Sequence, residues 1–408
     1  MPAHQLHLPV LAGGRSVVGI DIGKNNHAAV AIGPQGEKIA SLATFQNNRE
    51  GVDILQARVL EPAGTPRQLL FAMEATGHYW MPLYHELVRR GYQGVVLNPI
   101  QTNGEARTRI RKTKTDKRDA EGIARFILTG KAQAARIPDE TTLGMRVLTR
   151  RLLQLVQMKG NAERAAQSLS DRIFPEYHGV MCKPFLPSGR ALIREIGLVP
   201  ENIAAEPEAT RDVLRRASRG QLSNETILEL IHRAEKSIGT RQAEAVINEA
   251  LHSSMELIED IEDQIVALDA ILADIMEDRD SPLTSLGIGT SLAAVIHAES
   301  DPATDFPSAR QYAAYAGLEP STFQSGQMEG TRAHISKRGS PHLRRALYLS
   351  AFVVYRKHAY FARIYKRFRK KKHSHQSALV VVARHLALVV WRMLVDNRKF
   401  TKTPPKRK

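Results

Sequence analysis

A run of apolar positions late in the chain places the strongest constraint on its fold. Between Leu251 and Ile275 eight positions are spaced alternately three and four residues apart, and seven of them are apolar. They are Leu251, Ser254, Ile258, Ile261, Ile265, Leu268, Leu272 and Ile275. Such spacing keeps one apolar seam facing a neighbouring helix, as in a coiled coil. We therefore predict a long helix, which packs on residues 143–170, on the same helix of a second subunit, or within an ordinary bundle.

The first 130 residues show a different pattern, in which short apolar runs alternate with helical segments. The runs at 17–23 and 27–32 predict a β-hairpin, because a turn of glycine and polar residues separates them. Further strands are expected at 39–45, 69–74 and 94–97, and helices at 79–90 and 116–128. The pattern predicts a mixed α/β domain.

These patterns predict a chain of α/β plus α class with four parts. An α/β domain is expected at 1–140, and a helical region with the coiled coil at 141–280. A mostly helical domain is expected at 281–396. The last part, 397–408, is rich in Lys, Arg, Thr and Pro, a composition typical of a disordered tail.

The charge balance indicates a polyanionic partner. Lys and Arg number 58 against 42 Asp and Glu, which gives a net charge of +16 and a pI near 10.0. Cationic surfaces bind nucleic acid by releasing counterions from its phosphates. Two basic blocks flank an acidic stretch at 256–280. The first block comprises Arg107, Arg109, Arg111, Lys112, Lys114, Lys117 and Arg118.

The second basic block spans 356–372, where nine cations and no acid interleave with Tyr and Phe. Aromatic rings beside cations are typical of surfaces on which nucleic-acid bases stack. A helix with an aromatic core face explains the same pattern equally well. The sequence leaves both interpretations open.

Nothing in the sequence indicates a membrane or secretory role. The single cysteine, Cys182, has no partner for an intrachain disulfide, and a cytoplasmic location fits best. The long apolar run at 378–394 is interrupted by Arg384, His385 and Arg392. We therefore expect a buried amphipathic helix there rather than a membrane span.

Four acids are candidates for a catalytic metal site. Asp21 lies inside an apolar strand, and Glu74 ends another. Asp116 and Asp119 are three residues apart and so share one helix face. A buried carboxylate is costly unless it is paired or binds a metal, and converging carboxylates suit Mg²⁺. Two such ions could hold the attacking and leaving oxygens of a phosphodiester.

Each acid also has an ordinary structural explanation. Strand ends are often solvated, Asp116 could be only a helix cap, and Asp119 could only stabilise the helix dipole. The first basic block changes this balance, because seven cations beside two acids would hold a phosphate backbone over a metal. We favour the metal site for the four acids taken together.

The order of these motifs resembles the IS110 family of DEDD transposases. The N-terminal motifs are Gly-Ile-Asp21-Ile-Gly, Glu74-Ala-Thr-Gly and Thr-Asp116-Lys-Arg-Asp119-Ala. The C-terminal motifs are Leu286-Gly-Ile-Gly-Thr290, Tyr315-Ala-Gly-Leu-Glu-Pro320, Gln324-Ser-Gly326 and Lys337-Arg-Gly-Ser340. The resemblance covers most of the chain, and an IS1111-like branch fits it.

The resemblance implies an N-terminal RuvC-like domain of RNase H type and a C-terminal transposase domain. It also implies that Ser325 is a nucleophile forming a phosphoserine link to DNA. A structured bridge RNA would pair with donor and target DNA, in a homo-oligomer of two or four subunits. We expect Lys337, Arg338, Arg344 and Arg345 to contact phosphates. A turn serine with a solvated hydroxyl is the ordinary alternative for Ser325, and Ser321 and Thr322 are rival hydroxyls.

Three other classes of protein share part of this pattern. An actin-like or sugar-kinase ATPase opens with a similar strand, but it should carry a second Asp-x-Gly turn, which we do not find. A RuvC-like nuclease or junction resolvase would use the four acids with water and would not need Ser325. A non-catalytic RNA-binding protein would need only the cations.

Overall fold

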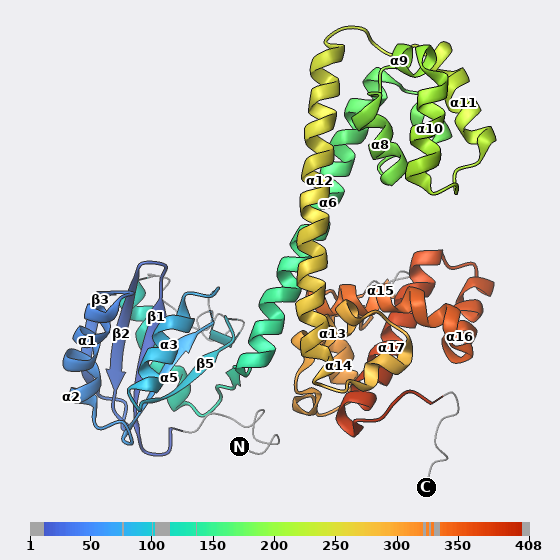
Figure 1. Cartoon of the computed structure of the whole chain (residues 1–408). Helices are drawn as coiled ribbons and strands as arrows, with labels where there is room; N and C mark the ends of the chain where they lie inside the picture. Colours follow the sequence, from blue (N-terminus) through green and yellow to red (C-terminus); the bar gives the residue numbers. More distant parts are fainter. Residues whose placement is uncertain are drawn as a thin grey trace. The chain divides into compact units, whose positions relative to one another are not determined.

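The computed structural model describes residues 12–75, 77–99, 101–102, 115–135, 137–320 and 335–401, and the backbone of two short strands at 324–325 and 328–329. The chain divides into two compact units, Met1–Asp139 with Thr304–Pro307 and Glu140–Ala303 with Ser308–Lys408. The first unit contains the six-stranded sheet and the second is mostly helical (Figure 1).

The sheet of the first unit has the strand order β3-β2-β1-β4-β5-β6. The first three strands form an antiparallel meander, and β4 and β5 run parallel to β1. The strands are β1 (Ser16–Ile22), β2 (Asn26–Ile32), β3 (Lys38–Gln46), β4 (Leu69–Glu74), β5 (Gln93–Leu97) and β6 (Ala134–Ala135). The predicted mixed α/β domain is confirmed, and each predicted strand is present.

Alternation along the central strands sends side chains into two separate cores. On one face, Val18 and Ile20 pack with Leu83 of α3 (Trp80–Arg89) and with the segment α1 (Arg49–Leu55), η2 (Gln56–Leu60) and α2 (Glu61–Ala63). On the other face, Val17 and Val30 pack with Ile123 of α5 (Asp116–Leu128). Because both faces are covered, β1 and β2 are apolar along nearly their whole length.

A long antiparallel helix pair opens the second unit. Helix α6 (Glu140–Ile173) packs along α12 (Glu244–Glu277), and the two lie side by side in Figure 1. Of the predicted seam, Leu251, Ile258, Ile261 and Leu272 are buried. The partner of the predicted helix is therefore α6 of the same chain, the first of the three alternatives.

Five shorter helices connect the far ends of α6 and α12, and we call them the lobe. They are α7 (Tyr177–Val180), α8 (Pro187–Glu195), α9 (Pro200–Ala205), α10 (Pro207–Ser218) and α11 (Asn224–Glu235). Their apolar residues share one core with Ala166, Leu251 and Met255 of the helix pair. The lobe thus closes the turn between two helices of the long pair.

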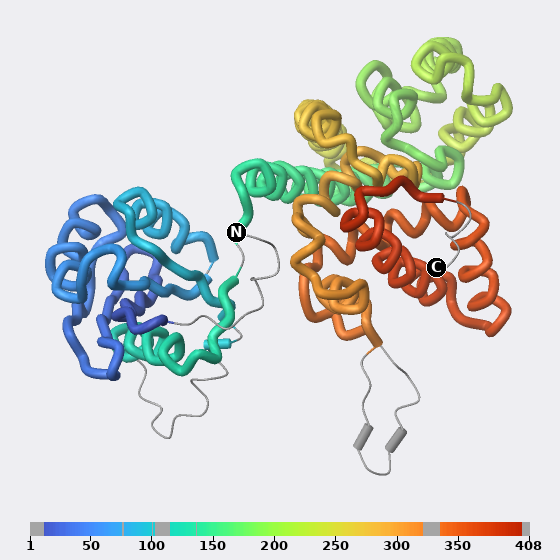
Figure 2. The backbone as a smooth tube through the Cα atoms, turned by 90° about the horizontal axis from the view of Figure 1, so that it is seen from below, coloured from blue at the N-terminus to red at the C-terminus, as the bar shows by residue number. Residues whose placement is uncertain are grey.

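The chain ends in a group of helices drawn in orange and red in Figure 2. They are η3 (Pro282–Leu286), α13 (Thr290–Ser300), α14 (Ala309–Tyr315), α15 (Pro341–Lys357), α16 (Ala359–Lys370) and α17 (His375–Asp396). Within the described ranges, only α17 is long and apolar enough to cross a membrane. It packs on α14, α15 and α16 and buries Leu379, Leu386 and Val390, as expected for a core helix.

The chain continues in ordered contacts after α17, where we expected a disordered tail from residue 397. The ring of Phe400 stacks on Phe361 with ring centroids 5.8 Å apart, and it meets His358 edge to face. The Phe400 amide donates to the Ser285 hydroxyl at 2.8 Å. Phe400 thus holds the first residues of the basic C-terminal segment against the helical unit. Residues 402–408 lie outside the described residues.

Candidate active site

Asp21 and Glu74 end up side by side at one edge of the sheet. The parallel register joins Ile20 to Met73, so that the next residue of each strand is one of the two acids. Val17 and Ala72 lie in the core beneath α5, and Asp21 and Glu74 are an even number of residues further along their strands. Both carboxylates therefore lie on the α5 face at the carboxyl ends of β1 and β4. Both residues are partly exposed.

A glycine on β1 allows α5 to cross the sheet at very short range. A Cβ atom on Gly19 would lie 2.0 Å from the carbonyl oxygen of Ala120 and 2.7 Å from the amide nitrogen of Ala124. No side chain fits in that space, so glycine is required for this helix to approach. Asp119 immediately precedes Ala120, and this contact brings the start of α5 near the strand that carries Asp21.

Local sequence fixes where α5 begins. The Thr115 hydroxyl caps the helix by accepting from the amide of Arg118, which places Asp116 and Asp119 in the first turn. These acids precede the buried residues Ala120 and Ile123 by one turn. They therefore extend the sheet-facing side of α5 beyond its buried part.

Contacts further along α5 show which way its first turn points. Glu121 lies 3.6 Å from the ammonium of Lys38, and Arg125 donates to the carbonyl of Gly36 at 3.3 Å. Gly36 lies in the β2–β3 turn and Lys38 is the first residue of β3. Both lie beside the amino end of β1, because Ile32 pairs with Lys38 and with Val17. The first turn of α5 consequently lies toward the other end of β1, where Asp21 is.

The four acids share one end of one face, but they do not form a closed set of metal ligands. Among the described residues, no three His, Cys, Asp or Glu side chains are arranged to hold one metal ion. Glu74, Asp116 and Asp119 make no hydrogen bond or ion pair within the described ranges. Oxygen-only donors that lack protein partners fit a hard divalent cation by their chemistry.

His27 lies next to this site, and the sequence analysis did not identify it. It is 3% exposed, and its Nδ1 accepts from the Gly23 amide at 3.3 Å. Burial lowers the pKa of His27, although a hydrogen bond with Asn47 opposes this effect. Its ring packs edge to face on Phe45 in the core opposite α5. His27 therefore supports the β1–β2 turn through Gly23. Its ring lies on the face of the sheet opposite α5, whereas the four acids lie on the α5 face.

The predicted phosphate contacts fall into three groups. Lys117 and Arg118 are exposed on the first turn of α5, beside the acids. Lys337, Arg338 and Arg345 are also exposed. The guanidinium of Arg344 instead donates to the Lys337 carbonyl at 3.0 Å and to that of Ala316 at 3.4 Å. The remaining five, Arg107, Arg109, Arg111, Lys112 and Lys114, lie outside the described residues.

Ser325 belongs to a two-stranded hairpin within the second unit of the chain. Strand β7 (Gln324–Ser325) pairs with β8 (Met328–Glu329). The segments leading to this hairpin are joined by backbone hydrogen bonds from Ser336 to Glu319 at 2.8 Å and from Ser340 to Tyr315 at 2.9 Å. These hydrogen bonds hold the two segments together at the base of the hairpin. The side chain of Ser325 lies outside the described residues.

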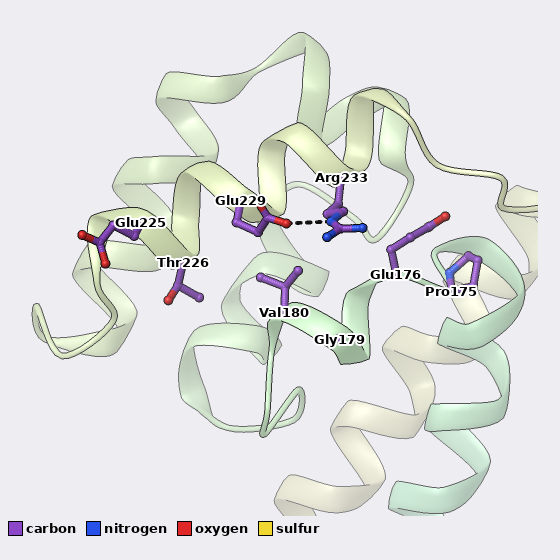
Figure 3. A pocket seen from close by; sticks show the side chains of 8 residues that line it. All are labelled: Pro175, Glu176, Gly179, Val180, Glu225, Thr226, Glu229 and Arg233. Atoms are coloured by element: carbon purple, nitrogen blue, oxygen red, sulfur yellow. Dashed lines mark hydrogen bonds and ion pairs between the residues drawn. The ribbon is translucent and has the colours of Figure 1, made fainter.

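A separate hollow of about 470 Å³ lies in the lobe, between α7 and α11 (Figure 3). Its wall contains the Glu229–Arg233 ion pair at 2.7 Å, and Glu176, whose carboxylate accepts from the Ser237 hydroxyl at 2.7 Å. Arg233, Glu229 and Glu176 thus already have partners, and none of the predicted site residues lines the hollow.

Comparison with known proteins agrees with this arrangement. A transposase family whose name marks a DEDD domain of the IS110 type matches residues 18–175. A second family, described as "Transposase IS116/IS110/IS902 family", matches residues 283–366. The first match contains nearly all of the sheet and all four acids, and the second contains α13 to α15, most of α16 and the Ser325 hairpin.

Two relatives match nearly the whole chain, and a third matches a shorter part of it. An uncharacterized 44.8 kDa protein of insertion element IS116 from Streptomyces clavuligerus is 26% identical and covers 95% of this chain and 96% of its own length. A pilin gene-inverting protein from Moraxella bovis is 22% identical over 95% of this chain and 98% of its own. An uncharacterized 43.6 kDa protein of insertion element IS110 from Streptomyces coelicolor is 34% identical over 36% of each chain. With both transposase matches in the same order along one sequence, the chain belongs to the IS110 family of transposases.

Proposed function

We propose that this transposase cleaves and rejoins DNA at the four-acid end of its sheet, with divalent metal ions bound there. The observation that carries the proposal is the convergence of Asp21, Glu74 and the first turn of α5 on one face, with three of the four acids unpaired within the described residues. A RuvC-like fold of RNase H type fits the antiparallel meander joined to two parallel strands. The family implies dependence on a divalent metal.

In this proposal the acids Asp21, Glu74, Asp116 and Asp119 hold two Mg²⁺ ions. Bound Mg²⁺ would polarise a phosphodiester and stabilise charge on its oxygens. Lys117 and Arg118 lie on the same turn as two of the acids and would hold the DNA backbone. The basic residues 107–114 would extend this grip from the segment that precedes α5.

Ser325 is the proposed nucleophile. Its hydroxyl loses a proton, Oγ bonds to the scissile phosphorus, and one P–O bond to the DNA breaks. The leaving oxygen takes up a proton. Rejoining reverses the step with an oxygen of another strand, so the number of phosphoester bonds is conserved and no nucleotide is consumed. The Ser336–Glu319 and Ser340–Tyr315 hydrogen bonds would fix the base of the hairpin during this step.

The partners follow from the family resemblance. Donor and target DNA would be paired with a structured bridge RNA, and two or four subunits would handle the strands. The four parts 1–140, 141–280, 281–396 and 397–408 would serve as catalytic domain, helical linker, serine-bearing domain and basic tail. The pilin gene-inverting relative suggests that inversion of a DNA segment is within reach of this chemistry.

The test is the nature of the DNA intermediate. We expect wild-type protein with Mg²⁺, DNA and cognate RNA to form an adduct that resists SDS and is removed by protease. Ser325→Ala should abolish the adduct and strand joining, while Ser321→Ala should retain both. Strand cleavage that persists in Ser325→Ala without an adduct would instead favour the water-using nuclease or resolvase. An adduct on tyrosine would overturn the serine assignment.

A further inference from the structure

The C-terminal helices contain a long stretch of sequence without acids. From Gly330 to Val395 there is no Asp or Glu, and the described cations there form one ion pair, Arg392 with Asp396 just beyond the stretch. Helix α16 lies inside this stretch and is one of its most basic segments. No carboxylate of this stretch can therefore neutralise its charges, and no ion pair joins them to a described residue.

The aromatic residues of this region are already engaged in packing. The Tyr355 and Tyr365 rings stack with centroids 4.5 Å apart, and the Tyr365 hydroxyl lies 2.7 Å from Nδ1 of His375. Phe361 is fully buried and stacks on Phe400. These contacts join α15, α16 and α17 to one another and dock the segment after α17. Of the two interpretations of the aromatic pattern, the core face explains these three rings, whereas Tyr360 is 39% exposed.

The cations of α16 lie on its opposite, exposed face. Arg363, Lys366, Arg367 and Lys370 are all exposed and recur at helical spacing, so they form one stripe, which we call the α16 basic stripe. No ion pair joins any of the four to a described residue. Seven residues of helix extend about 10 Å, a length over which one strand of B-DNA presents about three phosphates.

Like charges three and four residues apart destabilise a helix. The α16 basic stripe contains several such pairs, and the buried side of the helix holds it in place through Phe361 and Ile364. A bound polyanion would remove this repulsion. A membrane surface fits less well, because an interfacial helix exposes its apolar face to lipid, whereas the apolar face of α16 is turned into the protein.

We propose that the α16 basic stripe binds a nucleic-acid backbone through its phosphates, without reading bases and independently of the four acids and Ser325. Phe361 and Tyr365 support the helix from its buried side and do not stack on bases. These four residues are not among the cations predicted at 337–345 or in the first basic block. It gives the C-terminal unit its own grip on nucleic acid.

The test variant carries Arg363→Gln, Lys366→Gln, Arg367→Gln and Lys370→Gln together. The matched control removes four cations that have acidic partners in the same unit, Arg194→Gln, Arg211→Gln, Arg216→Gln and Arg233→Gln. Both variants lose the same charge. The stripe variant also loses like-charge repulsion, so its melting temperature should equal or exceed that of the wild type.

Binding is measured by fluorescence anisotropy with a labelled 20-base-pair duplex and a 20-nucleotide single strand, across a range of KCl concentrations and without divalent metal. We expect the stripe variant to bind at least about tenfold more weakly, and the slope of log Kd against log salt to fall by about 2.7 for duplex, at roughly 0.9 per phosphate contact. A fall of about 2.1 confined to the single strand, at roughly 0.7 per contact, would identify that strand as the partner. The control should change neither quantity.

Two results would overturn the proposal. One is an unchanged salt slope in the stripe variant, or an equal change in the control. The other is a loss of binding to phosphatidylserine vesicles in the stripe variant while nucleic-acid binding stays intact, which would assign the stripe to membranes. Because the assay contains no metal and measures no cleavage, failure of the catalytic proposal would leave its outcome unchanged.

Discussion

The acids of the long helix pair and the acids at the sheet edge are treated very differently by the fold. On α12, the Glu262 carboxylate receives two hydrogen bonds from Arg190 at 2.7 and 2.9 Å, and the Lys159 ammonium lies 2.6 Å away. The Arg190 hydrogen bonds lower the pKa of Glu262 to about 2. Glu259 is likewise met by Arg194 at 2.7 Å. These acids are neutralised by the chain itself and serve to join the lobe to the helix pair.

Three of the four acids at the sheet edge, in contrast, are not paired with cations of the described residues. Glu74, Asp116 and Asp119 have no hydrogen-bond or ion-pair partner within the described ranges, although Lys117 and Arg118 are their neighbours in sequence. Carboxylates held near one another without cations repel, and a bound cation would relieve that repulsion. Ion pairing therefore distinguishes Glu259 and Glu262 from Glu74, Asp116 and Asp119, whose carboxylates have no partner among the described residues.

The largest effect is expected from neutralising the sheet-edge acids. Asp21→Asn or Glu74→Gln should lower DNA cleavage by at least about a hundredfold, since even groups that only support metal ligands account for 10–100-fold. Thermal stability of Glu74→Gln should be unchanged or higher, because this carboxylate has no hydrogen-bond or ion-pair partner among the described residues. Labelled-DNA cleavage and circular-dichroism melting measure the two quantities. Full activity in either variant would remove the basis of the comparison.

Displacing α5 should affect stability and activity together. Gly19→Ala places a methyl group 2.0 Å from the Ala120 carbonyl, so α5 must shift, at a cost of about 1–3 kcal/mol. Cleavage should fall because Asp116 and Asp119 move with the helix. Gly144→Ala is the control, since an added Cβ there meets nothing within 4 Å and alanine should stabilise α6 by about 0.5–1 kcal/mol. A Gly19→Ala protein as stable as wild type would contradict the close approach.

A buried neutralised acid offers a third test. Glu299 is 4% exposed, accepts from the Ser340 hydroxyl at 2.8 Å and lies 3.0 Å from the Arg150 guanidinium. Arg150→Leu should cost about 1–3 kcal/mol in urea unfolding, because it leaves the buried carboxylate with one partner fewer. Adding Glu299→Gln should recover part of that loss. If the two changes are simply additive, the pair is not coupled.

The smallest effect concerns acid pH. The pKa of Glu262 is lower in the folded chain than its ordinary 4.5, so its contribution is fully present above about pH 4.5 and is lost as the pH falls toward about 2. In Glu262→Gln the urea-unfolding midpoint should therefore fall less between about pH 4.5 and about pH 2 than it does in wild type. Glu249→Gln, an exposed acid on the same helix, should leave it as in wild type. If the urea-unfolding midpoint falls equally steeply with decreasing pH in wild type and in Glu262→Gln, the assigned pairing of Glu262 is refuted.

Local signals in the sequence were sufficient to predict the elements that build the site. Helix α5 spans 116–128 as predicted, because Thr115 caps its start and Gly130 follows its end. The apolar alternation also identified β1 and β4, and with them the edge at which Asp21 and Glu74 lie. The long helix α12 followed from its heptad spacing, which describes one face and is independent of where the partner comes from.

What the sequence could not predict depends on contacts between distant residues. Helix α12 can pack on α6 only because the lobe reverses the direction of the chain between them. The Arg190–Glu262 pair joins residues 72 positions apart. The prediction of a disordered tail overlooked Phe400, whose apolar partners come from α16. Pairing of charges is likewise a tertiary property, so the sequence did not show that Glu262 has cationic partners while Glu74 has none among the described residues.

Binding of Mn²⁺ to the intact chain, followed by electron paramagnetic resonance, tests the central claim most directly. We expect wild type and Glu262→Gln to bind Mn²⁺ alike, while Asp21→Asn and Glu74→Gln lose that binding. Equal Mn²⁺ binding by all four proteins would contradict the claim that the sheet-edge acids hold the metal.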